Sequence, residues 1–127
     1  MKPLILSLLL LFPIPAYPDL WEAIVWRESR GQVDAFNPAE KAAGILQIRP
    51  CVIADLNRIA GYERWTLDDR WCPAKSWMIF REYTGHWITR FGLEDTPENR
   101  ARIFNGGPRG YRKTSTVEYW RSVEERI

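Results

Sequence analysis

The sequence has few of the residues that build metal centres. It contains one histidine and two cysteines in 127 residues, which is too few for a structural zinc site unless carboxylates complete it. Neither sign of charge is in large excess: the formal net charge is +2, which is too balanced to indicate nucleic-acid binding. We therefore expect no metal, no cofactor and no nucleic-acid partner.

Long apolar runs are absent except near the start, where residues 4–12 are apolar apart from Ser7. A transmembrane helix needs about 20 such residues. With Lys2 before the run, the segment predicts a secretory signal cleaved after Ala16; an uncleaved N-terminal anchor is the alternative. We expect residues 17–127 to be exported, to the periplasm or outside the cell, with no stable membrane span once the signal is cleaved.

Apolar and aromatic residues are plentiful, at 46% hydrophobic with seven Trp, five Tyr and five Phe. The length fits one domain, which we expect to be monomeric. Proline, capping residues and glycine mark helix ends throughout. The predicted helices cover about 18–29, 50–60, 73–91, 97–105 and 116–127, with a shorter helical piece after Thr66. The sequence therefore predicts an all-α, single-domain bundle.

Between the predicted helices, residues 30–42 have turn residues and are predicted to be a loop. Residues 44–48 fit either a helical turn or a strand. Residues 109–114 form a basic stretch that we expect to be a flexible, solvated loop. In the longest helix aromatic residues recur every three or four positions, which favours a core spine over a sugar-binding surface; they are Trp77, Phe80, Tyr83, Trp87 and Phe91.

Glu28 is unusual because it continues the apolar stripe of Trp21, Ile24 and Val25 on the first predicted helix. A carboxyl group pushed toward the interior loses solvation, which favours its protonated form and suits a general acid. A Glu in the last turn of a helix is otherwise a solvated residue or a cap partner. Glu28 is therefore the candidate catalytic residue.

The two cysteines, Cys51 and Cys72, are an even pair in a chain that we expect to be exported, which favours a disulfide. It would close a loop of about 20 residues and contribute roughly 3 kcal/mol to stability. Two buried thiols are the alternative.

Four short motifs follow one another along the chain. They are Glu28-Ser29-x-Gly31, Asn37-Pro38, Gly44-x-x-Gln47-x-x-Pro50 and Phe104-Asn105-Gly106-Gly107-Pro108. Their order and spacing over residues 19–127 resemble the soluble lytic transglycosylase (SLT-type) family, whose domain is related to goose-type lysozyme. The resemblance implies a lysozyme-like helical fold and a lytic transglycosylase-like catalytic domain over residues 17–127.

The resemblance also implies an activity. The enzyme would cut the β-1,4 bond between N-acetylmuramic acid and N-acetylglucosamine in peptidoglycan and leave a 1,6-anhydro product, with Glu28 acting as acid and then base. The substrate-binding candidates are Ser29, Asn37, Gly44, Ile45, Gln47, Phe104, Asn105 and Tyr119. Several have a structural alternative: Ser29 as a cap, Gln47 as a core-edge amide and Asn105 as a helix cap.

The chain departs from the family at Phe104, where a Tyr usually places its hydroxyl near the acid. Tyr119 or Tyr111 could supply a hydroxyl instead, and Tyr119 is favoured because it lies on a predicted helix. Two other functions remain open: a lysozyme-type hydrolase, with Asp34 or Glu40 as a second acid, and a non-catalytic wall-binding module. Glycan strands are the expected partner, in wall turnover or beside a secretion, conjugation or phage assembly.

Overall fold

The computed structural model describes residues 18–127, so the predicted signal over residues 1–16 lies outside the described residues. The described chain is predominantly helical, as predicted, with one small two-stranded sheet. The α-helices are α2 (Pro18–Ser29), α3 (Pro50–Ala60), α4 (Pro73–Arg90), α5 (Pro97–Gly106) and α6 (Val117–Glu124). The 3-10 helices are η1 (Leu67–Trp71), η2 (Gly110–Arg112) and η3 (Thr114–Thr116). Among these helices, none is long and apolar enough to cross a membrane.

The helix ends follow the local chemistry of the sequence. α3, α4 and α5 each begin with a proline, whose fixed φ suits the first helical turn. Thr96 caps α5 by accepting a hydrogen bond from the Asn99 amide at 3.1 Å. Gly61 ends α3 with a φ of 82°, a left-handed conformation that glycine adopts without a side-chain clash.

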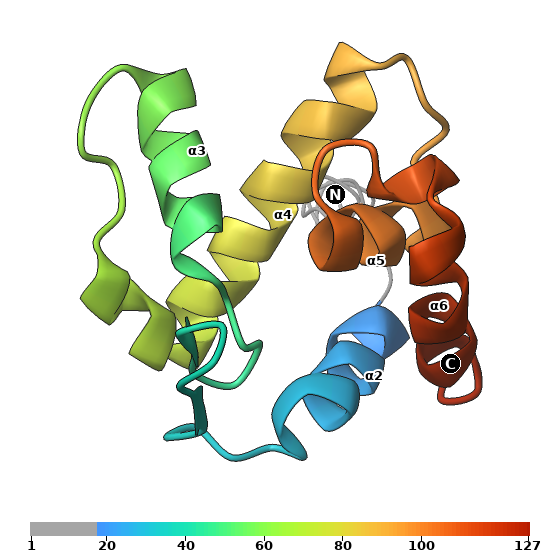
Figure 1. Ribbon diagram of the computed structural model, residues 1–127, viewed down its shortest axis with the longest axis horizontal. Helices are drawn as coiled ribbons and strands as arrows, with labels where there is room; N and C mark the ends of the chain where they lie inside the picture. Colours follow the sequence, from blue (N-terminus) through green and yellow to red (C-terminus); the bar gives the residue numbers. More distant parts are fainter. Residues whose placement is uncertain (1–17) are drawn as a thin grey trace, which may run out of the picture.

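Helix α4 runs through the middle of the molecule (Figure 1). α3 and η1 pack against it from one side and α5 from the other, while α6 packs on α5 and α2. Phe80 and Tyr83 of α4 are 0% and 1% exposed, so the aromatic stripe is a core spine, as predicted. Helix α4 therefore separates α3 and η1 on one side of the molecule from α5 on the other.

A short hairpin connects α2 to α3 and was not predicted. β1 (Phe36–Asn37) pairs antiparallel with β2 (Ala42–Ala43), and Ala43 also bridges Ile48. Strands of two residues carry too little alternation to be read from a sequence. Gly44 follows with a φ of +82°, and a Cβ there would lie 1.9 Å from the Arg70 carbonyl oxygen. The glycine is therefore required because the hairpin packs directly on η1.

Arg70 fixes the hairpin to η1 by hydrogen bonds. One guanidinium nitrogen, Nη1, donates to the carbonyl oxygens of Lys41 at 2.7 Å and Ile48 at 2.9 Å. The Arg70 side chain is buried, and burial lowers its pKa. The hairpin and η1 are thus joined into one unit.

The predicted disulfide is absent, because Cys51 and Cys72 are both free thiols. Cys51 lies in the first turn of α3 and is exposed. Cys72 ends η1 and precedes α4, where its backbone amide donates to the Asp69 carbonyl. The two thiols belong to separate elements, and their even number was no evidence that they meet.

The C-terminal region differs from the prediction in two ways. Residues 109–114 form η2 and the start of η3 rather than an irregular loop. Gly110 lies so close to α5 that a Cβ would be 2.0 Å from the Arg102 carbonyl oxygen. Helix α6 also begins without a side-chain cap, although capping residues were expected to mark the helix ends: the hydroxyl of its N-cap Thr116 makes no capping bond and donates to the Gly110 carbonyl at 2.7 Å instead.

Candidate functional site

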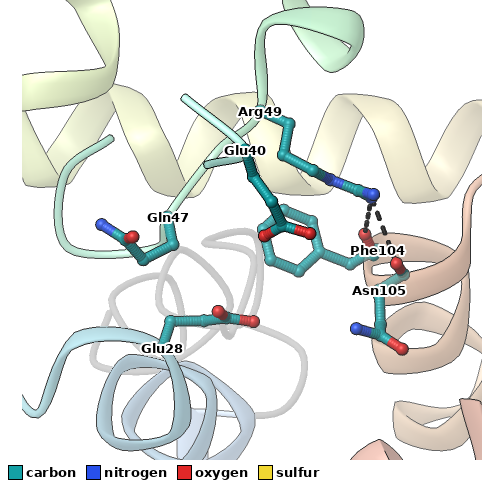
Figure 2. A pocket seen from close by; sticks show the side chains of 6 residues that line it. All are labelled: Glu28, Glu40, Gln47, Arg49, Phe104 and Asn105. Atoms are coloured by element: carbon teal, nitrogen blue, oxygen red, sulfur yellow. Dashed lines mark hydrogen bonds between the residues drawn. The ribbon is translucent and has the colours of Figure 1, made fainter. Parts of the chain in front are cut away.

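A small polar pocket lies where the C-terminal end of α2, the hairpin and the C-terminal end of α5 face one another (Figure 2). Its volume is about 50 Å³. The lining residues are Glu28, Glu40, Gln47, Arg49, Phe104 and Asn105. Four of the predicted site residues are thus brought together from distant parts of the chain.

Glu28 lies in the last turn of α2 and is partly buried. Its Oε2 accepts a hydrogen bond from the Tyr119 hydroxyl at 2.7 Å. Burial raises the pKa of Glu28, and although the Tyr119 hydrogen bond and the charges of Arg27 and Arg49 oppose this effect, the pKa stays above its ordinary value. Glu28 can therefore keep a proton at a higher pH than an exposed glutamate can.

Tyr119 reaches Glu28 from α6 and is 4% exposed. Burial and the neighbouring Glu28 carboxyl raise the pKa of Tyr119 well above its ordinary range, so its hydroxyl stays a donor. The hydroxyl contact that the sequence analysis expected of Tyr119 is present, whereas Tyr111 packs near Phe91 with ring centroids 5.9 Å apart. A role for Tyr119 toward substrate stays a prediction.

Glu40 places a second carboxyl group in the pocket, facing Glu28 from the hairpin side (Figure 2). Asn37 shapes the turn that carries it: its Oδ1 accepts hydrogen bonds from the amides of Ala39 at 3.0 Å and Glu40 at 3.4 Å. Asn37 itself does not line the pocket. Asp34, the other candidate second acid, does not line it either.

Ser29 and Ile45 bind each other rather than pointing free groups at the pocket. The Ser29 hydroxyl donates to the Ile45 carbonyl at 2.7 Å and accepts from the Gly31 amide at 3.2 Å. Ser29 is 8% exposed. These contacts match the structural alternative for Ser29, because its hydroxyl proton is already donated to the Ile45 carbonyl. They also join the end of α2 to the hairpin.

Gln47 lines the pocket in a strained backbone conformation, with a φ of 52°. Its side-chain nitrogen donates to the carbonyls of Ala35 and Gly44, each at 2.9 Å. Those bonds hold the hairpin turn and leave the amide oxygen without a donor among residues 18–127. Strain of this kind costs on the order of 1–3 kcal/mol and is common at functional sites.

Arg49 is a pocket residue that the sequence analysis missed. Its Nη2 donates to the carbonyl oxygens of Phe104 and Asn105, both at 3.1 Å (Figure 2). A cation at the C-terminal end of α5 is favoured by the helix dipole. Arg49 occupies one of the variable positions of the Gly-x-x-Gln-x-x-Pro motif, between Gln47 and Pro50. That neighbourhood is the only sequence signal that could have marked it as a pocket residue.

Phe104 and Asn105 complete the pocket from α5. The Phe104 ring is 4% exposed and packs edge-on against Phe80, with centroids 5.1 Å apart. Asn105 is partly exposed and directs its amide toward the pocket (Figure 2). Within residues 18–127, no three His, Cys, Asp or Glu side chains lie close enough together to hold a metal ion.

Comparison with known proteins points to lysozymes of oysters. The chain is 31% identical over 83 residues to a lysozyme of Ostrea edulis, covering 65% of this chain and 58% of the relative. It is 45% identical over 83 residues to lysozyme 1 of Crassostrea virginica, covering 65% and 44%. A lysozyme of Magallana gigas is 44% identical over 45 residues, covering 35% and 33%.

The chain spans about half the length of the first two relatives. No family model matches the sequence, and no solved structure matches it. The similarity supports a lysozyme-like sequence relationship and a lysozyme-like helical fold. It gives no support to the narrower assignment to the soluble lytic transglycosylases.

Proposed function

We propose that the protein is a lysozyme-type muramidase that hydrolyses the β-1,4 bond between N-acetylmuramic acid and N-acetylglucosamine in peptidoglycan. The observation that carries the proposal is the state of Glu28: burial raises the pKa of its carboxyl group, and the Tyr119 hydroxyl fixes one of its two oxygens by a hydrogen bond. The similarity to proteins named lysozyme supports the same class of reaction.

Glu28 acts as the general acid. Tyr119 holds Oε2, so the proton resides on Oε1, which accepts no hydrogen bond from residues 18–127. Transfer of this proton to the glycosidic oxygen makes that oxygen a better leaving group as positive charge develops on the sugar ring. The Tyr119 hydrogen bond strengthens as the carboxylate forms, because hydrogen bonds to ionised groups are stronger.

Glu40 supports hydrolysis because it supplies a second carboxylate in the same pocket. Most glycosidases use two carboxyl groups, and the one that is not the acid activates a water or attacks the sugar. With Glu40 as the base, a water molecule gives its hydroxyl to the sugar carbon and its proton to Glu40. The Asn37 side chain fixes the turn that carries Glu40 by accepting hydrogen bonds from the amides of Ala39 and Glu40.

The second candidate is the lytic transglycosylase reaction, which the order of the four sequence motifs favours. Glu28 would then protonate the leaving oxygen and afterwards take a proton from the C6 hydroxyl of muramic acid. That hydroxyl oxygen bonds to the sugar carbon and closes a 1,6-anhydro ring, so no water is consumed. The two reactions share Glu28 and differ in whether Glu40 is needed.

The products separate these candidates. The purified protein is incubated with peptidoglycan and the released muropeptides are weighed by mass spectrometry, with Glu28→Gln alongside. Reducing muropeptides that are absent with Glu28→Gln support the muramidase, and loss of activity in Glu40→Gln but not in Asp34→Asn supports Glu40 as its base. Products lighter by one water support the lytic reaction instead. Binding without any product supports a non-catalytic wall-binding module.

The proposal carries expectations about setting. A substrate that lies outside the cytoplasm requires export, in line with the predicted signal. The glycan strand is the partner that the pocket is expected to bind, and the protein is expected to act as a monomer. A role in wall turnover, or beside a secretion, conjugation or phage assembly, is compatible with the same chemistry.

A further inference from the structure

A second cavity lies between the C-terminal ends of α2 and α6. Its volume is about 230 Å³. The lining residues are Trp26, Arg27, Arg30, Ser122, Glu125 and Arg126. We call these residues the arginine cavity. Three guanidinium groups face one carboxylate there, so the cavity is electropositive.

The three arginines of this cavity form no ion pair among residues 18–127, although the charge of Arg27 also acts on Glu28. Six other basic side chains of residues 18–127 form ion pairs, but Arg27, Arg30 and Arg126 form none. Like charges gathered at one place repel each other. The negative ends of two helix dipoles reduce that cost, which lets the fold hold the three cations together with their charge open to an external anion.

Aromatic rings and one hydrogen bond hold these guanidinium groups in place. Arg126 and Arg30 lie 4.3 Å and 5.3 Å from the centre of the Trp26 ring, which is 41% exposed. Arg27 donates from Nε to the Ser122 hydroxyl at 2.9 Å. Cation–π contacts use no N–H donor, so most donors of the cavity stay available for the bidentate binding of an oxyanion.

The arginine cavity lies close to the catalytic acid through α2 and Tyr119. Arg27 and Glu28 are neighbours on α2, and the Arg27 guanidinium lies 5.3 Å from the centre of the Tyr119 ring. The hydroxyl of that same ring binds Glu28. The two sites are therefore linked through adjacent residues of α2 and through a single tyrosine ring.

We propose that the arginine cavity binds the free carboxylates of peptidoglycan peptide stems, as a second contact with the polymer that is cut at Glu28. The proposal rests on the proposed function, because it takes the substrate to be peptidoglycan. Stem carboxylates fit the cavity because planar carboxylates match the fork of an arginine side chain. Stems also recur along the strand, so one strand can occupy both sites.

The test is binding of purified peptidoglycan by Arg30→Gln/Arg126→Gln. A matched control, Arg58→Gln/Arg121→Gln, removes the same charge from two exposed arginines outside the cavity. Neither Arg30 nor Arg126 lines the catalytic pocket, so both double variants should keep their cleavage rate on strands without stems. Binding to stem-bearing peptidoglycan should weaken about tenfold in the cavity variant and stay close to the wild type in the control.

Three modified substrates identify the ligand. With strands stripped of stems by an amidase, or with stem carboxylates converted to amides, the cavity variant and the wild type should bind equally. Equal weakening in both double variants, or a difference that persists without stems, would overturn the proposal. So would a difference that disappears only when phosphate-bearing wall polymers are removed. If the wild type releases no product from any strand, the proposed function fails instead, and the two failures are thus told apart.

Discussion

Replacing Tyr119 with Phe isolates the contribution of one hydroxyl group to the acid. The ring stays in the core, and only the 2.7 Å hydrogen bond to Glu28 is lost. A hydrogen bond to an ionised group contributes about 1.5–3 kcal/mol and one to a neutral group about 0.5–1.5 kcal/mol. Because Glu28 becomes ionised as it gives up its proton, the bond stabilises the transition state over the ground state by roughly 1–1.5 kcal/mol. We expect kcat to fall about five- to tenfold.

The same replacement should move the pH profile in a defined direction. The Tyr119 hydrogen bond lowers the pKa of Glu28 against the larger effect of burial. Without it the pKa rises further, and since the acid must be protonated, the alkaline limb of kcat should shift to higher pH.

Steady-state release of soluble muropeptides as a function of pH measures both effects. Tyr111→Phe is the control, because the Tyr111 ring packs near Phe91 and its hydroxyl makes no bond to Glu28. An unchanged kcat in Tyr119→Phe, or an alkaline limb that moves to lower pH, would refute the reasoning. An equal effect in Tyr111→Phe would show that the loss is not specific to the acid.

The remaining predictions concern stability. Gly44→Ala should lower the free energy of unfolding by about 3 kcal/mol or more, because it combines left-handed backbone strain with a backbone clash. Gly61→Ala is the control: a Cβ there meets nothing within 4 Å, so it should cost only about 1 kcal/mol. Urea unfolding measures both losses, and equal losses would contradict this reasoning. Folding raises the pKa of Glu28. The contribution of Glu28 to folding stability is therefore complete below its ordinary pKa of 4.5 and is lost as the pH rises through its pKa in the folded protein. Glu28→Gln should therefore raise Tm at about pH 8 more than at about pH 4, and a constant difference would count against the burial of this carboxyl. A reducing agent should leave Tm unchanged, because Cys51 and Cys72 are free, and a drop would reveal a disulfide.

The helices could be predicted from the sequence because their ends are marked by local chemistry. Proline and the Thr96 cap begin α5, and Gly61 ends α3. The hairpin could not be predicted, because its strands have two residues each and depend on packing against η1. The absence of a disulfide was equally hidden, since pairing depends on where two helix ends lie in space.

The site was predictable where a residue broke a pattern or completed a motif. Glu28 interrupts an apolar stripe, and Gln47 and Asn105 occupy motif positions; all three line the pocket. Arg49 was missed because an arginine before a helix has many ordinary uses, and only the fold shows its bonds to the end of α5. Gly44, a substrate-binding candidate by its motif position, has a structural use that the sequence did not show, because its lack of a side chain lets the hairpin pack on η1.

The hydroxyl beside Glu28 comes from a different helix than the resemblance to the four motifs implied. A buried carboxyl group needs a hydrogen-bond donor at a fixed position, and any helix that places a hydroxyl at that position can supply it. Phe104 has no hydroxyl and fills the core against Phe80, while Tyr119 brings an oxygen to Glu28 from α6. The contact between α2 and α6 thereby becomes part of the site. Changes that loosen this helix pair, even far from the pocket, should therefore reduce activity before they unfold the protein.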